Sequence, residues 1–140
     1  MAKQKGNTPS DLELQILKVL WMVESDQESP LSVREIRLQL AEEGRELAHT
    51  SVITTLNIMV KKKFVARRKR KNAFLFYPLV SKDSVNEQEV SSLLDRVFDG
   101  SAEQLLLALF DAKEVDSQQI TEMKKLINRK ARQMNKPPED

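Results

Sequence analysis

A run of basic residues in the middle of the chain constrains its fold more than any other feature. From Lys61 to Lys71, eight of eleven residues are Lys or Arg and none is acidic. Such a run repels itself and lowers stability unless a partner neutralises it. A nucleic-acid backbone would do so, because Lys and Arg contacts to phosphates release condensed counterions. The segments on either side of the run therefore decide how it is to be interpreted.

A helical pattern precedes the run, from Thr50 to Lys62. At about 100° per residue, one arc of this helix is apolar. It holds Val52, Leu56, Met59 and Val60. The opposite face carries short hydrogen-bonding side chains and a cation, at Thr50, Ser51, Thr54, Asn57 and Lys61. Thr and Asn are mediocre helix formers, so helix stability does not explain their presence on this face. We interpret the face as a surface that reads bases. A plain solvated helix is the alternative.

A strand pattern begins at Phe64 and a second covers Ala73 to Val80, with Asn72 offering the turn between them. The basic residues thus lie along and at the tip of a β-hairpin. A helix followed by a basic hairpin is the layout of a winged helix-turn-helix, whose helix enters the major groove while the wing lies on the flanking backbone. The predicted wing contacts to DNA are Arg67, Arg68, Arg70, Lys71 and Asn72.

Two capping boxes organise the residues before the basic run. Ser10 with Glu13 begins a helix whose core stripe is predicted to be Leu12, Ile16, Val19, Leu20 and Val23. A second apolar line of Leu14, Leu17 and Trp21 indicates that this helix is covered on two faces. Leu31 is expected to add a short strand, and Ser32 with Glu35 begins a helix that Gly44 ends as a left-handed cap. Residues 1–9 are expected to be a disordered lead-in and residues 10–80 the winged-helix domain.

Three further helices are predicted beyond Pro78, capped by Ser84 with Glu87, Ser101 with Gln104, and Asp116 with Gln119. The middle one contains LLLALF, apolar on every side, and such a helix needs burial on every side. We expect residues 81–135 to form a helical homodimerisation domain and residues 136–140 a disordered tail. The predicted dimer residues are Val90, Leu94, Val97, Phe98, Leu105, Leu106, Leu109, Ile120, Met123 and Ile127.

Composition supports two halves with different tasks. Residues 1–71 carry 14 Lys/Arg and 9 Asp/Glu, a net of +5, whereas residues 72–140 carry 9 and 12, a net of −3. The lone His49 has no thiol and no carboxylate partner by motif, and there is no cysteine, Gly-rich phosphate loop or metal-ligand spacing. We therefore expect no enzyme activity, cofactor or metal. Without a signal peptide or membrane-length apolar run, we expect a cytoplasmic protein with no direct membrane insertion.

Four segments in order resemble the penicillinase-repressor family of bacterial transcription regulators. They are LELQILKVLW at 12–21, LAHTSVITTLNIMVKKKFV at 47–65, FLFYPLV at 74–80 and RVFDGSAEQLLLALF at 96–110. The resemblance implies a homodimeric winged-helix repressor that binds an inverted-repeat operator, in the family often one that controls β-lactamase or related genes. It also implies an upstream membrane sensor or protease. The induced cut would fall by spacing at Ala108 and Leu109, although neither residue type of the family is kept.

The chain departs from the family pattern at the end of the recognition helix. Ile58, Met59, Lys62 and Lys63 stand where the family usually has Arg, Leu and a Lys-Gly turn. The absence of cysteine excludes copper sensing by the cysteine cluster of one family branch. The alternative function is a winged-helix module for protein interaction without specific DNA binding.

Overall fold

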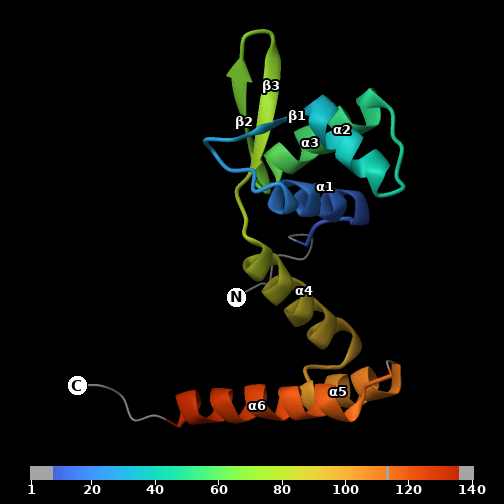
Figure 1. Cartoon of the computed structure of the whole chain (residues 1–140), viewed down its shortest axis with the longest axis vertical. Helices are drawn as coiled ribbons and strands as arrows, with labels where there is room; N and C mark the ends of the chain where they lie inside the picture. Colours follow the sequence, from blue (N-terminus) through green and yellow to red (C-terminus); the bar gives the residue numbers. More distant parts are fainter. Residues whose placement is uncertain (1–7, 113, 136–140) are drawn as a thin grey trace, which may run out of the picture. The chain divides into compact units, whose positions relative to one another are not determined.

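The computed structural model describes residues 8–112 and 114–135, so most of the predicted lead-in and the whole predicted tail lie outside the described residues. The chain is mostly helical with one small antiparallel sheet (Figure 1), which confirms the predicted fold class. The elements are α1 Asp11–Met22, β1 Leu31–Ser32, α2 Val33–Glu42, α3 His49–Lys61, β2 Val65–Arg70, β3 Ala73–Pro78, α4 Lys82–Val97, α5 Ala102–Ala112 and α6 Ser117–Met134.

The chain divides into two compact units, and the division falls inside α4. The first unit extends to Ser92 and the second begins at Leu93. The first turns of α4 thus belong with the winged helix, because Val85 is buried in its hydrophobic core.

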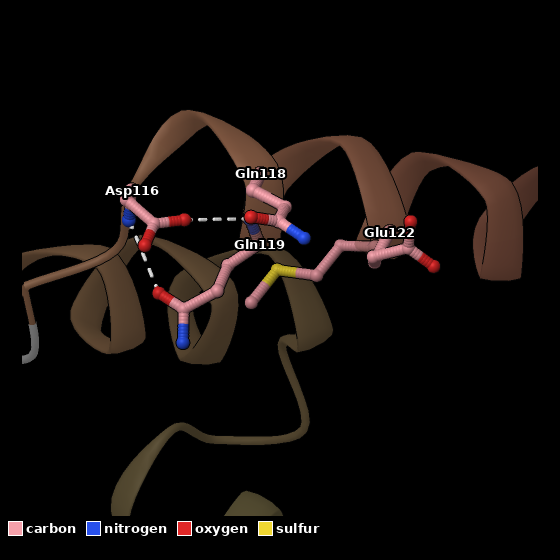
Figure 2. Close-up of a pocket in the computed structure, with 5 residues that line it drawn as sticks. Asp116, Gln118, Gln119 and Glu122 are labelled. Carbon is pink, nitrogen blue, oxygen red and sulfur yellow. Dashed lines mark hydrogen bonds between the residues drawn. The ribbon is translucent and has the colours of Figure 1, made fainter.

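Reciprocal side-chain caps begin three of the helices as predicted. In α1, the Ser10 hydroxyl accepts from the Glu13 amide and the Glu13 carboxylate accepts from the Ser10 amide. Ser32 with Glu35 does the same for α2, and Asp116 with Gln119 for α6. Figure 2 shows the last pair beside a shallow depression at the start of α6. These caps satisfy amides that the helix itself leaves without partners.

The predicted cap at Ser84 is wrong. α4 begins at Lys82, and the Ser81 hydroxyl accepts from the Ser84 amide at 3.0 Å, so Ser81 holds the capping position. Two serines three residues apart offer the same local chemistry. The helix continues back to this position, because the Val85 amide donates to the Ser81 carbonyl at 3.1 Å.

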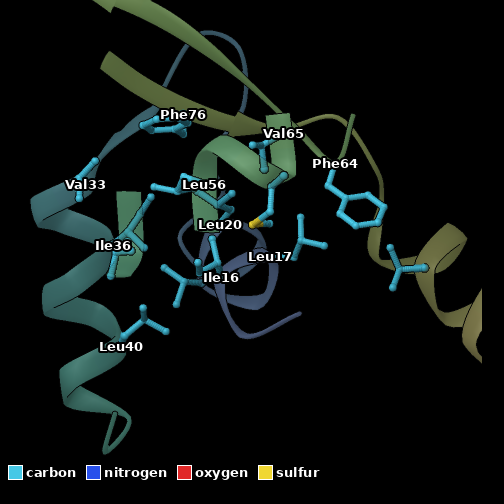
Figure 3. Packing of buried hydrophobic residues seen from close by; sticks show 14 residues of the cluster. Ile16, Leu17, Leu20, Val33, Ile36, Leu40, Leu56, Phe64, Val65 and Phe76 are labelled. Atoms are coloured by element: carbon cyan, nitrogen blue, oxygen red, sulfur yellow. The ribbon is translucent and has the colours of Figure 1, made fainter. Parts of the chain in front are cut away.

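The core of the first unit lies between α1, α2, α3 and the sheet (Figure 3). Its fully buried side chains are Ile16, Leu17, Val19, Leu20, Ile36, Leu40, Val52, Leu56, Met59, Val65 and Phe76. Leu17 confirms that α1 is covered on a second face. Trp21 lies half-buried on that face and its indole N–H donates to the Val80 carbonyl at 3.0 Å. Val23 was predicted to be core but is 40% exposed, because α1 ends at Met22 and Val23 is its C-cap.

The sheet has the order β1-β3-β2, and all its pairings are antiparallel. The predicted short strand at Leu31 is confirmed, since Leu31 pairs with Phe76 on one edge of β3. On the other edge Arg67 lies directly opposite Phe76, and Lys69 lies opposite Phe74. This register decides which face of the hairpin each basic side chain occupies.

The end of α3 adopts a Schellman motif around Lys63. The Lys63 amide donates to the Val60 carbonyl and the Phe64 amide to the Met59 carbonyl, at 3.1 and 2.9 Å. Lys63 has φ +65°, so a lysine here adopts the left-handed conformation that glycine adopts most readily. The end of α2 makes the same pair of bonds around Gly44, at φ +91°. The chain therefore uses one turn twice, once with glycine and once with lysine.

Replacing Lys63 with glycine should raise the free energy of unfolding by up to about 1 kcal/mol, because a Cβ in the left-handed region costs about that much. Urea unfolding of the full chain measures the change. The control is Lys63→Ala, which removes the charge but keeps the Cβ and should give no comparable gain. Equal stabilisation by both variants would show that the charge, and not the backbone, is responsible.

Candidate nucleic-acid interface

The polar face of α3 is exposed as its sequence pattern predicts. Thr50, Ser51, Thr54, Asn57 and Lys61 are all exposed, while Val52, Leu56 and Met59 anchor the opposite side in the core. Ile58 lies beside the polar face and is 43% exposed. The helix therefore offers an outward surface of hydroxyls, an amide and an ammonium group, and its contact with DNA stays a prediction.

Two arginines fix the turn between α2 and α3. The Arg37 Nε donates to the Leu47 carbonyl at 3.2 Å, and the Arg45 Nη1 donates to the Gln15 Oε1 at 2.7 Å. The second bond connects the turn to α1. Although both residues are basic, these contacts give them a structural task in presenting α3.

The basic residues of β2 are divided between the two faces of the hairpin. Side chains alternate along a strand, so Arg67 and Lys69 share the face of buried Val65, which is the face toward α3. Arg68 and Arg70 point to the opposite face. There the Arg68 Nη2 donates to the carbonyl of Gln27, in the loop between α1 and β1. A structural role for Arg68 is thus visible, and its contact with phosphate remains untested.

Arg67 connects the wing to α3. Its Nη1 donates to the Asn57 Oδ1 at 3.1 Å, and its Cζ lies 4.7 Å from the centroid of the Phe74 ring. The sequence predicted Asn57 and Arg67 as separate DNA contacts, one for bases and one for phosphates. The structure brings them together and adds Phe74, which sequence reasoning missed. The sequence signal for this contact was an aromatic residue, Phe74, on the strand predicted to pair with the basic run.

Lys62 corrects the interpretation that the basic run lacks acidic partners. Its Nζ lies 3.0 and 3.1 Å from the two carboxylate oxygens of Glu13, and 5.9 Å from the centroid of the Phe64 ring. Glu13 is 3% exposed, and its carboxylate both caps α1 and pairs with a cation at the end of α3.

The predicted wing contacts Lys71 and Asn72 are exposed at the hairpin turn.

The predicted dimer residues leave much apolar surface uncovered in a single chain. Within the described residues, no side chain of α5 or α6 is buried. Several large apolar side chains are exposed there, namely Leu106, Leu107, Leu109, Phe110, Leu126, Ile127 and Met134. In α4, Val90 and Val97 are exposed as well. Leu94, Phe98, Leu105, Ile120 and Met123 are half-buried.

The described residues contain neither a membrane span nor a metal cluster. No helix there is long and apolar enough to cross a membrane. No group of three or more His, Cys, Asp or Glu residues there has a geometry that could hold a metal ion. His49 begins α3 and is exposed.

The chain matches a known protein family over most of its length. The model of the penicillinase repressor family matches residues 9–129. The chain belongs to the penicillinase repressor family. This family consists of DNA-binding transcriptional repressors, which confirms the interpretation as a repressor and not an enzyme.

Curated relatives of this repressor family are distant but nearly full-length matches. The methicillin resistance regulatory protein MecI of Mammaliicoccus sciuri is 22% identical over 121 residues, 86% of this chain and 94% of that protein. The penicillinase repressor of Bacillus licheniformis is 23% identical over 118 residues, 84% of this chain and 88% of that protein. The solution structure of monomeric Bacillus licheniformis BlaI with the blaP half-operator covers 59% of this chain and 92% of that chain, at a TM-score of 0.44 and 23% identity.

Substitutions in this repressor should separate base contacts from phosphate contacts. Asn57→Ala should weaken operator binding by about 1 to 3 kcal/mol and relax sequence preference, because it removes a base contact. Lys71→Gln should weaken operator and random duplex alike and reduce the salt slope by about one. Fluorescence anisotropy over a range of salt concentrations, on both duplexes, measures these effects. Identical behaviour of the two variants on both duplexes would contradict the division of roles.

Proposed function

We propose that the protein represses transcription as a homodimer that binds an inverted-repeat operator in the bacterial cytoplasm. The observation that carries this proposal is the exposed polar face of α3 beside a basic hairpin, in a chain of the penicillinase repressor family. α3 enters the major groove and the wing lies against the adjacent backbone. The names of the relatives, which mention methicillin resistance and penicillinase, favour control of β-lactamase or related genes.

In this proposal the polar residues of α3 contact base edges. Thr and Ser hydroxyls can donate to or accept from several bases, whereas Asn and Lys discriminate between them. The wing contributes positive charge that fixes the register on the duplex without reading sequence. Lys69 and Lys71 are best placed for this role, since Lys69 lies on the hairpin face toward α3 and Lys71 lies at the turn.

The helices after the wing provide the dimer contacts in this proposal. α5 and α6 leave large apolar side chains exposed, and contiguous apolar patches of this kind mark protein interaction sites. A twofold partner would cover them, because an isologous interface uses the same surface on both subunits. Two half-sites bound together then gain an effective concentration that multiplies affinity by about 10² to 10⁴.

Sedimentation velocity over micromolar concentrations should show a dimer. Leu106→Glu places a charge on the exposed apolar face of α5 and should shift the equilibrium to monomers. The matched control is Leu38→Glu, since Leu38 is an exposed leucine of α2 at 57% exposure and lies outside the predicted dimer residues. A stable, well-folded monomer for the unaltered chain at all concentrations would overturn the dimer.

Relief of repression by an upstream sensor or protease belongs to the same proposal. The position matched by spacing to the family's cut lies between Ala108 and Leu109 in α5, and Leu109 is 40% exposed in the single chain. Because dimerisation would cover this segment, we expect the dimer to resist cleavage there. Loss of the residues beyond it would remove α6 and with it most of the apolar contact surface.

Truncation after Ala108 should therefore abolish operator occupancy. The truncated chain should keep weak binding to a single half-site, since the winged helix forms its own core. Footprinting of full-length and truncated chains on a two-half-site operator measures the loss, with a single half-site duplex as the control. Full-length affinity in the truncated chain would refute the mechanism.

A further inference from the structure

We infer that Asn57 of α3 and Arg67 of the wing form one composite reading unit that presents hydrogen-bond donors to the duplex and selects guanine. This inference rests on the proposed function, in which α3 enters the major groove. It specifies the base that this site recognises and assigns a wing residue to sequence reading.

The chemistry of their contact fixes the orientation of the Asn57 amide. A guanidinium has five N–H donors and no acceptor, so it can bond only the oxygen of a carboxamide. The 3.1 Å contact from Arg67 Nη1 therefore turns the Asn57 Oδ1 toward the wing, engages one of its two lone pairs, and leaves the Nδ2 hydrogens available to another partner. An unrestrained Asn can turn either its amide oxygen or its amide nitrogen toward a base, whereas here Arg67 holds the oxygen toward the wing.

Phe74 holds the other member of the unit in place. The Arg67 guanidinium carbon lies 4.7 Å from the Phe74 ring centroid, within the range of a cation–π contact. Arg67 lies opposite Phe76 in the ladder, so Phe74 is its diagonal neighbour, which a long side chain can reach. A planar guanidinium supported in this way loses little further freedom when its remaining N–H groups bind. Asn57 and Arg67 are both exposed, so these donors are accessible.

The resulting donor pattern matches guanine and not adenine. In the major groove guanine offers two acceptors, N7 and O6, whereas adenine offers the N7 acceptor beside an amino donor. The usual pairing of Asn with adenine needs the amide oxygen to accept from that amino group. Here the same oxygen already accepts from Arg67, and the amino group would also approach a positive charge. In guanine, the Nδ2 hydrogens of Asn57 and the remaining N–H groups of Arg67 would meet two acceptors, N7 and O6.

The test uses the full-length chain and operators selected from a random duplex library. A guanine should be selected at one base pair in each half-site, and replacing it with 7-deazaguanine, which lacks the N7 acceptor, should weaken binding by about 5- to 100-fold. Asn57→Ala and Arg67→Gln should each lose the preference at that same base pair. The double variant should lose no more discrimination than the larger single loss, because coupled residues are not additive.

Two further variants separate reading from charge and from folding. Lys69→Gln removes a cation from the same face of β2 as Arg67, and it should weaken all duplexes while the guanine preference remains. Arg67→Lys keeps the charge but removes the planar fork, so it should lose the preference. Thermal melting of each variant, expected to match the unaltered chain, establishes that the fold persists.

Three results would overturn the inference. One is a selected base other than guanine at the base pair that Asn57→Ala affects. Another is that the two single variants change preference at different base pairs, which would make them independent contacts while the proposed repressor function stands. The third is that the unaltered chain selects no sequence over random duplex, in which case the proposed operator recognition fails and this inference with it.

Discussion

The arrangement of the winged helix depends on the turn at the end of α3. Its two bonds, from Lys63 to Val60 and from Phe64 to Met59, reverse the chain directly from helix into strand. Phe64 and Val65 then enter the core at once, at 4% and 0% exposure, which leaves the wing no loop in which to move. Glu13 secures the same turn from outside through Lys62. α3 and the hairpin are therefore joined without a loop, and the core and the Glu13–Lys62 ion pair hold the turn between them.

This connection explains how side chains of α3 and β2 come into contact, as Asn57 and Arg67 do. The start of β2 is fixed by burial, and its register with β3 is fixed by pairing from Val65 with Pro78 to Arg70 with Ala73. A shift of one residue would move every basic side chain to the other face of the hairpin. Arg67 would then face the loop that carries Gln27, and Arg68 would face α3. The division of the basic residues is thus a consequence of where two apolar residues enter the core.

Features that depend on local sequence could be predicted, and features that depend on register could not. The capping boxes at Ser10, Ser32 and Asp116 and the left-handed cap at Gly44 follow from a few neighbouring residues. The predicted cap at Ser84 was wrong because Ser81, three residues earlier, offers the same chemistry and caps the helix instead. The bond between Asn57 and Arg67 required the twist and pairing of the hairpin. The ion pair of Glu13 with Lys62 joins residues 49 positions apart, which no local pattern indicates.

The bond between Trp21 and Val80 has a practical consequence. Trp21 is the only tryptophan of the chain, and its indole N–H donates to the carbonyl of Val80, two residues before α4 begins. Indole emission depends on the polarity and hydrogen bonding around that nitrogen. The protein thus carries an intrinsic optical probe at the junction where the winged helix leads into α4. A change in packing around Val80 would therefore alter the emission of Trp21, with no added label.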